Sequence, residues 1–165
     1  MFPNLQAATT SKDPFVINLA SVISEVACQP YFKDHLDKSQ KEQKAIVTSF
    51  QRELRNELFM GVLGVYWSTE FMPSDSSRDS IDIYGEGDGF VVAIELDKNR
   101  ADQVAKKFVS RMAILPDTKV YYISICYPGT KSMSKSECVK YFGYCGNLAK
   151  RIGNEYLGFI IEPRT

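Results

Sequence analysis

The sequence predicts an α/β fold, a mixed sheet flanked by helices, and two observations support this prediction. Four stretches carry apolar residues at helical spacing, whereas five others are short runs rich in β-branched and aromatic residues. The two kinds alternate over much of the chain, as in α/β proteins. With 165 residues, 44% of them hydrophobic, we expect a flexible N-terminal tail over 1–12 and a single domain over 13–165.

Composition narrows the function classes. The formal net charge is zero and the pI is about 6.6, which counts against a strong non-specific nucleic-acid binder but leaves room for a local basic groove. The sequence has neither a signal-like apolar segment nor a continuous apolar span, so we expect a cytoplasmic protein without a membrane partner. The four cysteines lack CxxC spacing, which is typical of buried free thiols in a reducing compartment.

Capping residues mark the first two helices. Asp13 followed by Pro14 predicts a helix that ends near Cys28. His35 then falls in a polar segment, where we expect a solvated loop. Ser39-Gln40-Lys41-Glu42 has the form of a capping box and predicts the start of a second, longer helix.

The second helix carries a glutamate on its predicted inward face. Wound at about 100° per residue, Glu57 falls inside the apolar stripe, whereas Glu53 lies at its edge. A buried glutamate needs a partner. We expect Glu57 either to bind a metal ion or to be a half-exposed acid paired with a nearby base. The stripe itself consists of Ile46, Val47, Phe50, Leu54, Leu58 and Gly61.

A glycine-rich hairpin follows a first strand over 62–71 and a loop over 73–79. Its two strands, 80–85 and 90–97, flank the turn Gly85-Glu86-Gly87-Asp88-Gly89. Three carboxylates lie in the strands themselves: Asp82, Glu95 and Asp97, which we term the hairpin acids. Because side chains alternate along a strand, Glu95 and Asp97 share one face while Lys98 takes the other.

The hairpin acids indicate a cation site. Three carboxylates that converge would repel one another and lose hydration, and a hard divalent cation removes that cost by accepting their oxygens. The sequence therefore predicts a site for Mg²⁺ or Mn²⁺ at this hairpin.

The rest of the chain alternates helix and strand. Asn99 predicts a cap for a helix over 100–115, and 119–127 is apolar enough to be an interior strand. Ser134 begins another capping box and a helix through about Ile152. A final strand over 155–162 completes the predicted order α-α-β-β-β-α-β-α-β.

Over roughly residues 40 to 126 the sequence resembles the PD-(D/E)xK nuclease superfamily. Its pattern is an acid in one strand, a loop, then acid-x-Lys in the next strand, matched here by Asp82, the hairpin and Glu95-Leu96-Asp97-Lys98. Asp97 stands where the pattern has lysine, and Lys98 follows one residue later. The resemblance implies a restriction-endonuclease-like core, α-β-β-β-α-β, here with an extra N-terminal helix and a C-terminal helix and strand.

The resemblance also implies an activity: Mg²⁺- or Mn²⁺-dependent hydrolysis of phosphodiester bonds in nucleic acid, with DNA favoured. The implied catalytic residues are Asp82, Glu95, Asp97 and Lys98. The implied metal ligands are Glu57 and the hairpin acids. Gln103, Lys106 and Lys107, on the helix after the hairpin, are the candidate nucleic-acid contacts. Either Lys98 reaches Asp97 through a bulge, or a lysine of that helix replaces it.

Two other functions remain open at this stage. The domain could be a catalytically degenerate relative that binds nucleic acid or a protein partner without cleavage. Alternatively, it is an unrelated α/β interaction protein with acids at its strand edges. The resemblance adds the expectation of a homodimer or a partner subunit.

Overall fold

The computed structural model describes residues 1–75, 78–130 and 134–164, so part of the predicted loop over 73–79 lies outside the described residues. Within them, six strands form one mixed sheet of order β1-β6-β5-β4-β3-β2. Strands β4, β5 and β6 are parallel, and the other neighbours pair antiparallel. The strands are β1 (Phe2–Ala8), β2 (Tyr66–Phe71), β3 (Ile81–Glu86), β4 (Phe90–Lys98), β5 (Lys119–Tyr127) and β6 (Glu155–Glu162).

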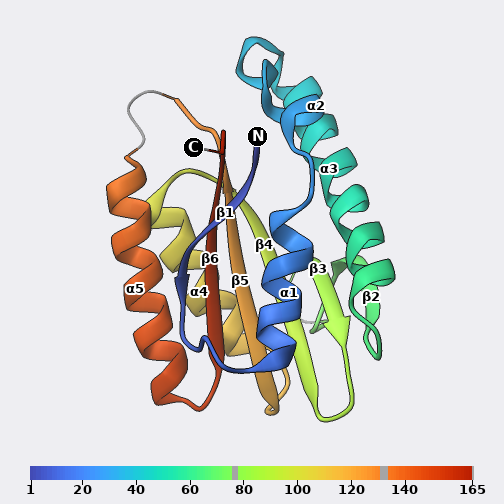
Figure 1. Ribbon diagram of the computed structural model, residues 1–165, viewed down its shortest axis with the longest axis vertical. Helices are drawn as coiled ribbons and strands as arrows, with labels where there is room; N and C mark the ends of the chain where they lie inside the picture. The colour runs from blue at the N-terminus through green and yellow to red at the C-terminus, as the bar shows by residue number, and fades with distance from the viewer. Residues whose placement is uncertain (76–77, 131–133, 165) are drawn as a thin grey trace.

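Helices cover both faces of the sheet (Figure 1). Helices α1 (Pro14–Ser24) and α3 (Gln40–Gly61) pack on the face that carries Val92, Ile94 and Leu96 of β4. Helices α4 and α5 pack on the opposite face, against Val91 and Ala93. The α/β class is therefore confirmed. The helical segments are α1 (Pro14–Ser24), α2 (Gln29–Phe32), the 3-10 turn His35–Asp37, α3 (Gln40–Gly61), α4 (Ala101–Ile114) and α5 (Lys135–Arg151).

The prediction of a flexible tail over 1–12 is wrong for most of that segment. Residues 2–8 form β1, an outer strand that pairs antiparallel with β6 from Phe2 opposite Glu162 to Ala8 opposite Leu157. The sequence of the strand, FPNLQAA, shows no regular apolar alternation, and its pairing with β6 shifts register between Leu5 and Ala7. A bulge of this kind hides the period-2 pattern on which strand prediction depends.

Three of the four predicted helix starts are confirmed by their caps. The side chain of Asp13 accepts from the Phe15 amide, Ser39 forms both bonds of a capping box, and Ser134 accepts from the Glu137 amide. The cap of α4 differs, because Arg100 occupies the capping position and its side chain makes no cap bond.

His35 is buried, which corrects its predicted place in a solvated loop. The residue is 2% exposed. Its ring packs edge-on against Phe32 and Tyr127, with ring centroids 5.2 and 5.8 Å away. The ring Nδ1 lies 3.1 Å from the Phe32 carbonyl oxygen. The segment between α1 and α3 folds back over the end of the sheet, so tertiary packing buries a residue whose sequence neighbours are polar.

No single helix of the described ranges is long and apolar enough to cross a bilayer. Taken together, Pro14–Ser24 and Gln29–Asp37 reach that length and apolar composition, but the pair is bent by 53°. All four cysteines are free and buried.

The hairpin that carries the hairpin acids depends on a glycine. A Cβ on Gly85 would lie 2.7 Å from both Trp67 Cζ3 and Val65 Cγ1, closer than packed atoms approach. We expect Gly85→Ala to lower the free energy of unfolding by about 2 kcal/mol in urea titrations. Gly143→Ala is the control, because its Cβ would meet no atom within 4 Å, and alanine in a helix should add about 0.5–1 kcal/mol. Equal losses in both variants would contradict the packing argument.

Candidate functional site

The hairpin acids lie where β3 and β4 separate. The paired residues of the two strands end at Ile83 opposite Ile94. Beyond that point the Asp82 carboxylate enters the gap and accepts a 2.7 Å hydrogen bond from the Leu96 amide. Asp82 thus replaces a backbone partner, and its side chain is held between the two strands.

Lys107 of α4 lies at the centre of the cluster. Its ammonium nitrogen is 2.9 Å from Asp97 Oδ1, 3.2 Å from Glu95 Oε2 and 3.8 Å from Asp82 Oδ2. It also donates to the Leu96 carbonyl oxygen at 3.3 Å. The three carboxylates therefore converge on one cationic group. The sequence predicted a divalent metal ion at this place, and in this structure the cation is the Lys107 side chain.

Arg111, one helical turn after Lys107, holds the other oxygen of Glu95. Its Nε donates to Glu95 Oε1 at 2.9 Å, and its guanidinium lies 3.4 Å from Asp79. The Glu95 side chain is 1% exposed, and each of its oxygens accepts a hydrogen bond from a cationic group. Its orientation is thereby fixed.

Burial raises the pKa of Glu95 and of Asp97 by more than the nearby cations lower it. Burial, followed by the charge of Asp82, raises the pKa of Glu95 to about 8 in spite of Lys107 and Arg111. Burial likewise raises the pKa of Asp97, against the effect of Lys107. Burial alone would lower the pKa of Lys107, but the three carboxylates raise it above its usual value. If all three hairpin acids were ionised, they would carry one more charge than Lys107 and Arg111 neutralise, and the proton that Glu95 keeps up to about pH 8 removes this excess.

The donor set suits a hard cation, although its present geometry is that of an ion-pair network. Within the described residues, no group of three or more His, Cys, Asp or Glu side chains is arranged to hold a metal ion. Asp97 Oδ2 is nevertheless buried and has no hydrogen-bond partner among those residues. An orphaned carboxylate oxygen beside two further carboxylates is the kind of ligand that Mg²⁺ and Mn²⁺ take. The donor atoms are thus of the type that such an ion takes, and in this structure Lys107 occupies the position between them.

Comparison with known proteins identifies no family for this chain. No protein-family model, curated protein or solved structure matches it. The site must be interpreted from its own chemistry.

A second group of polar side chains approaches Asp82 from the opposite face of the sheet. Gln51 of α3 donates to the Asp82 backbone carbonyl and, at 3.0 Å, to Glu70 Oε1. Ser80 donates to Glu70 Oε2 at 2.9 Å. Glu70 has a φ of 51°, a left-handed conformation that is uncommon for a residue with a side chain. These contacts join α3 and β2 to the start of β3.

A pocket of about 370 Å³ opens on this side, which we term the α3 pocket. It lies between the first half of α3 and the ends of β4 and β5, on the side of the sheet where α3 lies in Figure 1. Asp82 and Glu70 line it on the acidic side. The other lining residues include Gln43, Lys44, Val47, Lys98 and Tyr127. Asp82 therefore contacts the ion-pair network on one side and borders an open pocket on the other.

Glu57 is not on the inward face of α3, which corrects the prediction of a buried acid. It is exposed, whereas Phe50, Gln51, Leu54 and Leu58 are buried. The predicted stripe included Ile46, which is only half-buried, and that choice widened the arc toward Glu57. The polar residue that reaches the site from α3 is Gln51.

Lys98 lies on the face opposite Asp97, as alternation predicts. The pairing of β4 with β5 is continuous from Phe90 to Lys98, so this stretch contains no bulge to turn Lys98 toward Asp97. The lysine that contacts Asp97 is Lys107. The other two predicted nucleic-acid contacts, Gln103 and Lys106, also belong to α4 and do not line the α3 pocket.

Sequence reasoning missed three residues of the site: Gln51, Glu70 and Arg111. Two of them leave a signal. Gln51 is a polar residue adjoining the apolar stripe of α3, and Arg111 follows Lys107 by four positions, which puts both on one helix face. Glu70 leaves no signal, because its position depends on a backbone angle that the sequence does not specify.

The acidity of Glu95 predicts a pH dependence of stability. The folded protein keeps the proton of Glu95 up to a pKa of about 8, whereas its ordinary value is 4.5. The folded state thus binds more protons between these values, so stability falls as pH rises from about 4.5 to 8, by at most about 1.4 kcal/mol per pH unit. Glu95→Gln should flatten this part of a urea-unfolding profile measured from pH 5 to 9. An unchanged slope in the variant would assign the dependence to another group.

Proposed function

We propose that this chain is a metal-dependent nuclease that hydrolyses phosphodiester bonds, with DNA as the favoured substrate. The observation that carries the proposal is the convergence of the hairpin acids on one cation at the end of β4, with Asp82 also bordering an open pocket. Two features support it. The acids come from two adjacent strands, and the orphaned Asp97 oxygen provides a further ligand.

The arrangement of the elements also supports a restriction-endonuclease-like core. The order α3-β2-β3-β4-α4-β5 reproduces the α-β-β-β-α-β order that the resemblance implies. Its first three strands are antiparallel, and β5 returns parallel to β4 after the α4 crossover. The proposal is therefore supported by the order and pairing of the elements as well as by the short acidic motif.

In this proposal each residue has a defined task. Asp82, Glu95 and Asp97 would hold Mg²⁺ or Mn²⁺, which when bound supplies an acidified water and offsets charge on the phosphate. Arg111 keeps Glu95 oriented through its 2.9 Å bond. Lys107 would leave the centre of the cluster when an ion binds, and its ammonium, still carried by α4, would donate to a phosphate oxygen or to the attacking water.

A second candidate is a degenerate nuclease-like domain that binds nucleic acid or a protein partner without cleavage. The observation in its favour is that Lys107 and Arg111 already bond the hairpin acids, so the cluster is partly neutralised without an added ion. Such a protein would retain the ion-pair network for stability alone.

The two candidates differ in two measurements on the wild-type chain. Calorimetry with Mn²⁺ measures metal binding, and incubation of supercoiled plasmid with Mg²⁺ or Mn²⁺ measures nicking. The nuclease requires both. Metal binding without cleavage of DNA or RNA would favour the degenerate domain, and the lack of both would remove the metal site from the proposal.

A further inference from the structure

The α3 pocket borders Asp82 on the side away from Lys107. We propose that it receives one nucleotide of a single strand next to the scissile phosphate, so that the preferred substrate is single-stranded nucleic acid. This inference rests on the nuclease function proposed above and names its substrate class.

Size argues for one nucleotide. The pocket holds about 370 Å³, near the lower end of the range of about 300–1,000 Å³ typical of small-ligand sites. A base inside a duplex is stacked and paired, and it would have to be flipped out to enter such a space. A base of a single strand enters without that cost.

The lining provides a surface for the base. Tyr127 is half-buried and its ring is held in place by stacking on Phe32, with centroids 5.2 Å apart and planes 12° from parallel. A ring fixed in this way loses little freedom when a base packs against it. Val47 adds an apolar contact. The Gln43 Nε2 donates to the Lys38 carbonyl oxygen at 2.9 Å, which leaves its amide oxygen to accept a hydrogen bond from a base edge. Aromatic and amide groups without a fixed pattern accept any base.

The lining also provides for the backbone. Lys44 and Lys98 line the pocket together with Glu70 and Asp82, so positive side chains border the same space as the acids. A phosphate of the bound strand would contact the two lysines, which keep it beside Asp82. The nucleic-acid contacts are therefore expected on α3 and at the end of β4. The exposed Lys106 on α4 serves as a control.

Fluorescence anisotropy with a labelled eight-nucleotide single strand tests the inference, with Ca²⁺ as the probe ion to allow binding while limiting cleavage. We expect the single strand to bind at least about tenfold more tightly than a blunt hairpin duplex. Lys44→Gln and Lys98→Gln should each weaken binding and reduce the slope of log affinity against log salt by about 0.7. Lys106→Gln should change neither quantity.

Introduction of a negative or a positive charge at Gln43, which lies outside the hydrophobic core, gives a second test. Gln43→Glu should weaken binding of the single strand, and Gln43→Lys should strengthen it, because each nucleotide of the strand carries a negatively charged phosphate. Unfolding midpoints of both variants should match the wild type within a few degrees. The inference would be overturned if Gln43→Glu bound the single strand more tightly than Gln43→Lys, or if the two variants bound it equally well.

The two proposals fail in different ways. Duplex binding as tight as single-strand binding, or unchanged affinity in the pocket variants of a protein that binds Mn²⁺ and nicks plasmid, would overturn the substrate class and leave the nuclease intact. A chain that neither binds Mn²⁺ nor cleaves DNA or RNA would overturn both proposals.

Discussion

Asp82→Asn is expected to reduce metal-dependent cleavage by a factor on the order of 10³ or more, because a metal ion contributes several kcal/mol to phosphodiester hydrolysis. The asparagine oxygen can still accept the hydrogen bond from the Leu96 amide, so the fold should persist. The loss should therefore arise at the metal site. Single-turnover cleavage of a labelled oligonucleotide measures the rate, and calorimetry with Mn²⁺ should show weaker binding by the same variant.

Glu57→Gln is the matched control for this loss. It removes one carboxylate from the exposed face of α3 and changes the net charge by the same amount. We expect its cleavage rate to stay within about twofold of the wild type. A rate loss in Glu57→Gln as large as that in Asp82→Asn would mean that net charge, and not the hairpin site, controls activity.

Lys107→Met is expected to lower the metal-free stability by about 3 kcal/mol at pH 8 to 9. The methionine keeps the apolar stem of the side chain but removes the ammonium that contacts all three hairpin acids. Loss of one partner from a buried ion pair leaves charge uncompensated, which typically costs about 3–5 kcal/mol. Urea titration of the metal-free protein measures the loss.

A divalent cation should reverse most of that loss. In Lys107→Met the centre of the cluster is open, so Mg²⁺ or Mn²⁺ can replace the missing charge and stabilise the folded state by mass action. The rise in unfolding midpoint with metal should therefore be larger in this variant than in the wild type. Lys106→Met, at an exposed position one residue earlier, should lose almost no stability. Equal metal effects on all three proteins would show that the hairpin acids form an ion-pair network only.

Much of the fold was predictable because local chemistry specified it. The caps Asp13, Ser39 and Ser134 set three helix starts within a residue. The glycine-rich turn predicted the hairpin, and Gly89 has a φ of 79° as such a turn requires. The continuous apolar run of β5 predicted an interior strand. Each signal acts over a few residues, and no tertiary contact overrides it.

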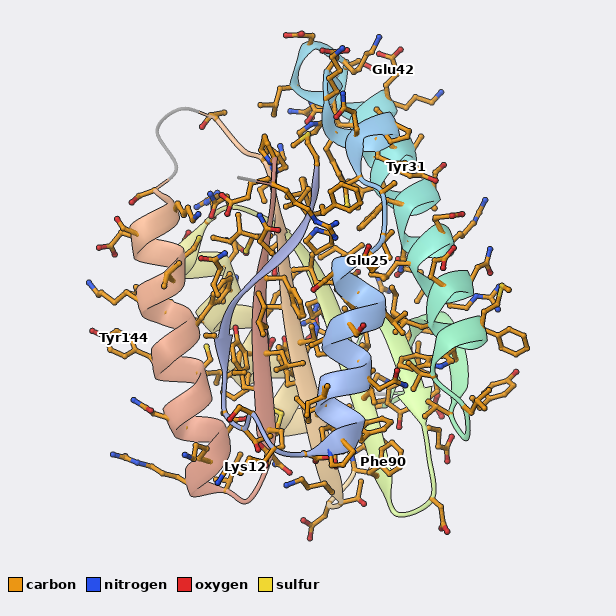
Figure 2. All side chains as sticks on the ribbon, in the orientation of Figure 1. Lys12, Glu25, Tyr31, Glu42, Phe90 and Tyr144 are labelled. Carbon is orange, nitrogen blue, oxygen red and sulfur yellow. The ribbon has the colours of Figure 1, made fainter. Side chains whose placement is uncertain are left out.

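The errors arose where distant contacts decide the local state. Strand β1 exists because β6, more than 140 positions away, offers an open edge. The exposure of Glu57 depends on how α3 is rotated against the sheet. In Figure 2 the labelled Glu42, near the start of the same helix, projects from the molecule. The labelled Phe90 lies at the lower end of α1, where its ring centroid is 4.9 Å from that of Phe15. Rotation and register of this kind are set by packing.

The hairpin of β3 and β4 shows most clearly what depends on the sequence alone and what depends on tertiary packing. Alternation along one strand was enough to predict that Glu95 and Asp97 share a face, since it follows from backbone geometry alone. Tertiary structure decided which cation meets them, because Lys107 approaches from α4, across the face of the sheet. It also decided that Asp82 borders an open pocket on the α3 side. The acids are therefore encoded locally, whereas their partners depend on how two layers of helices pack against one sheet.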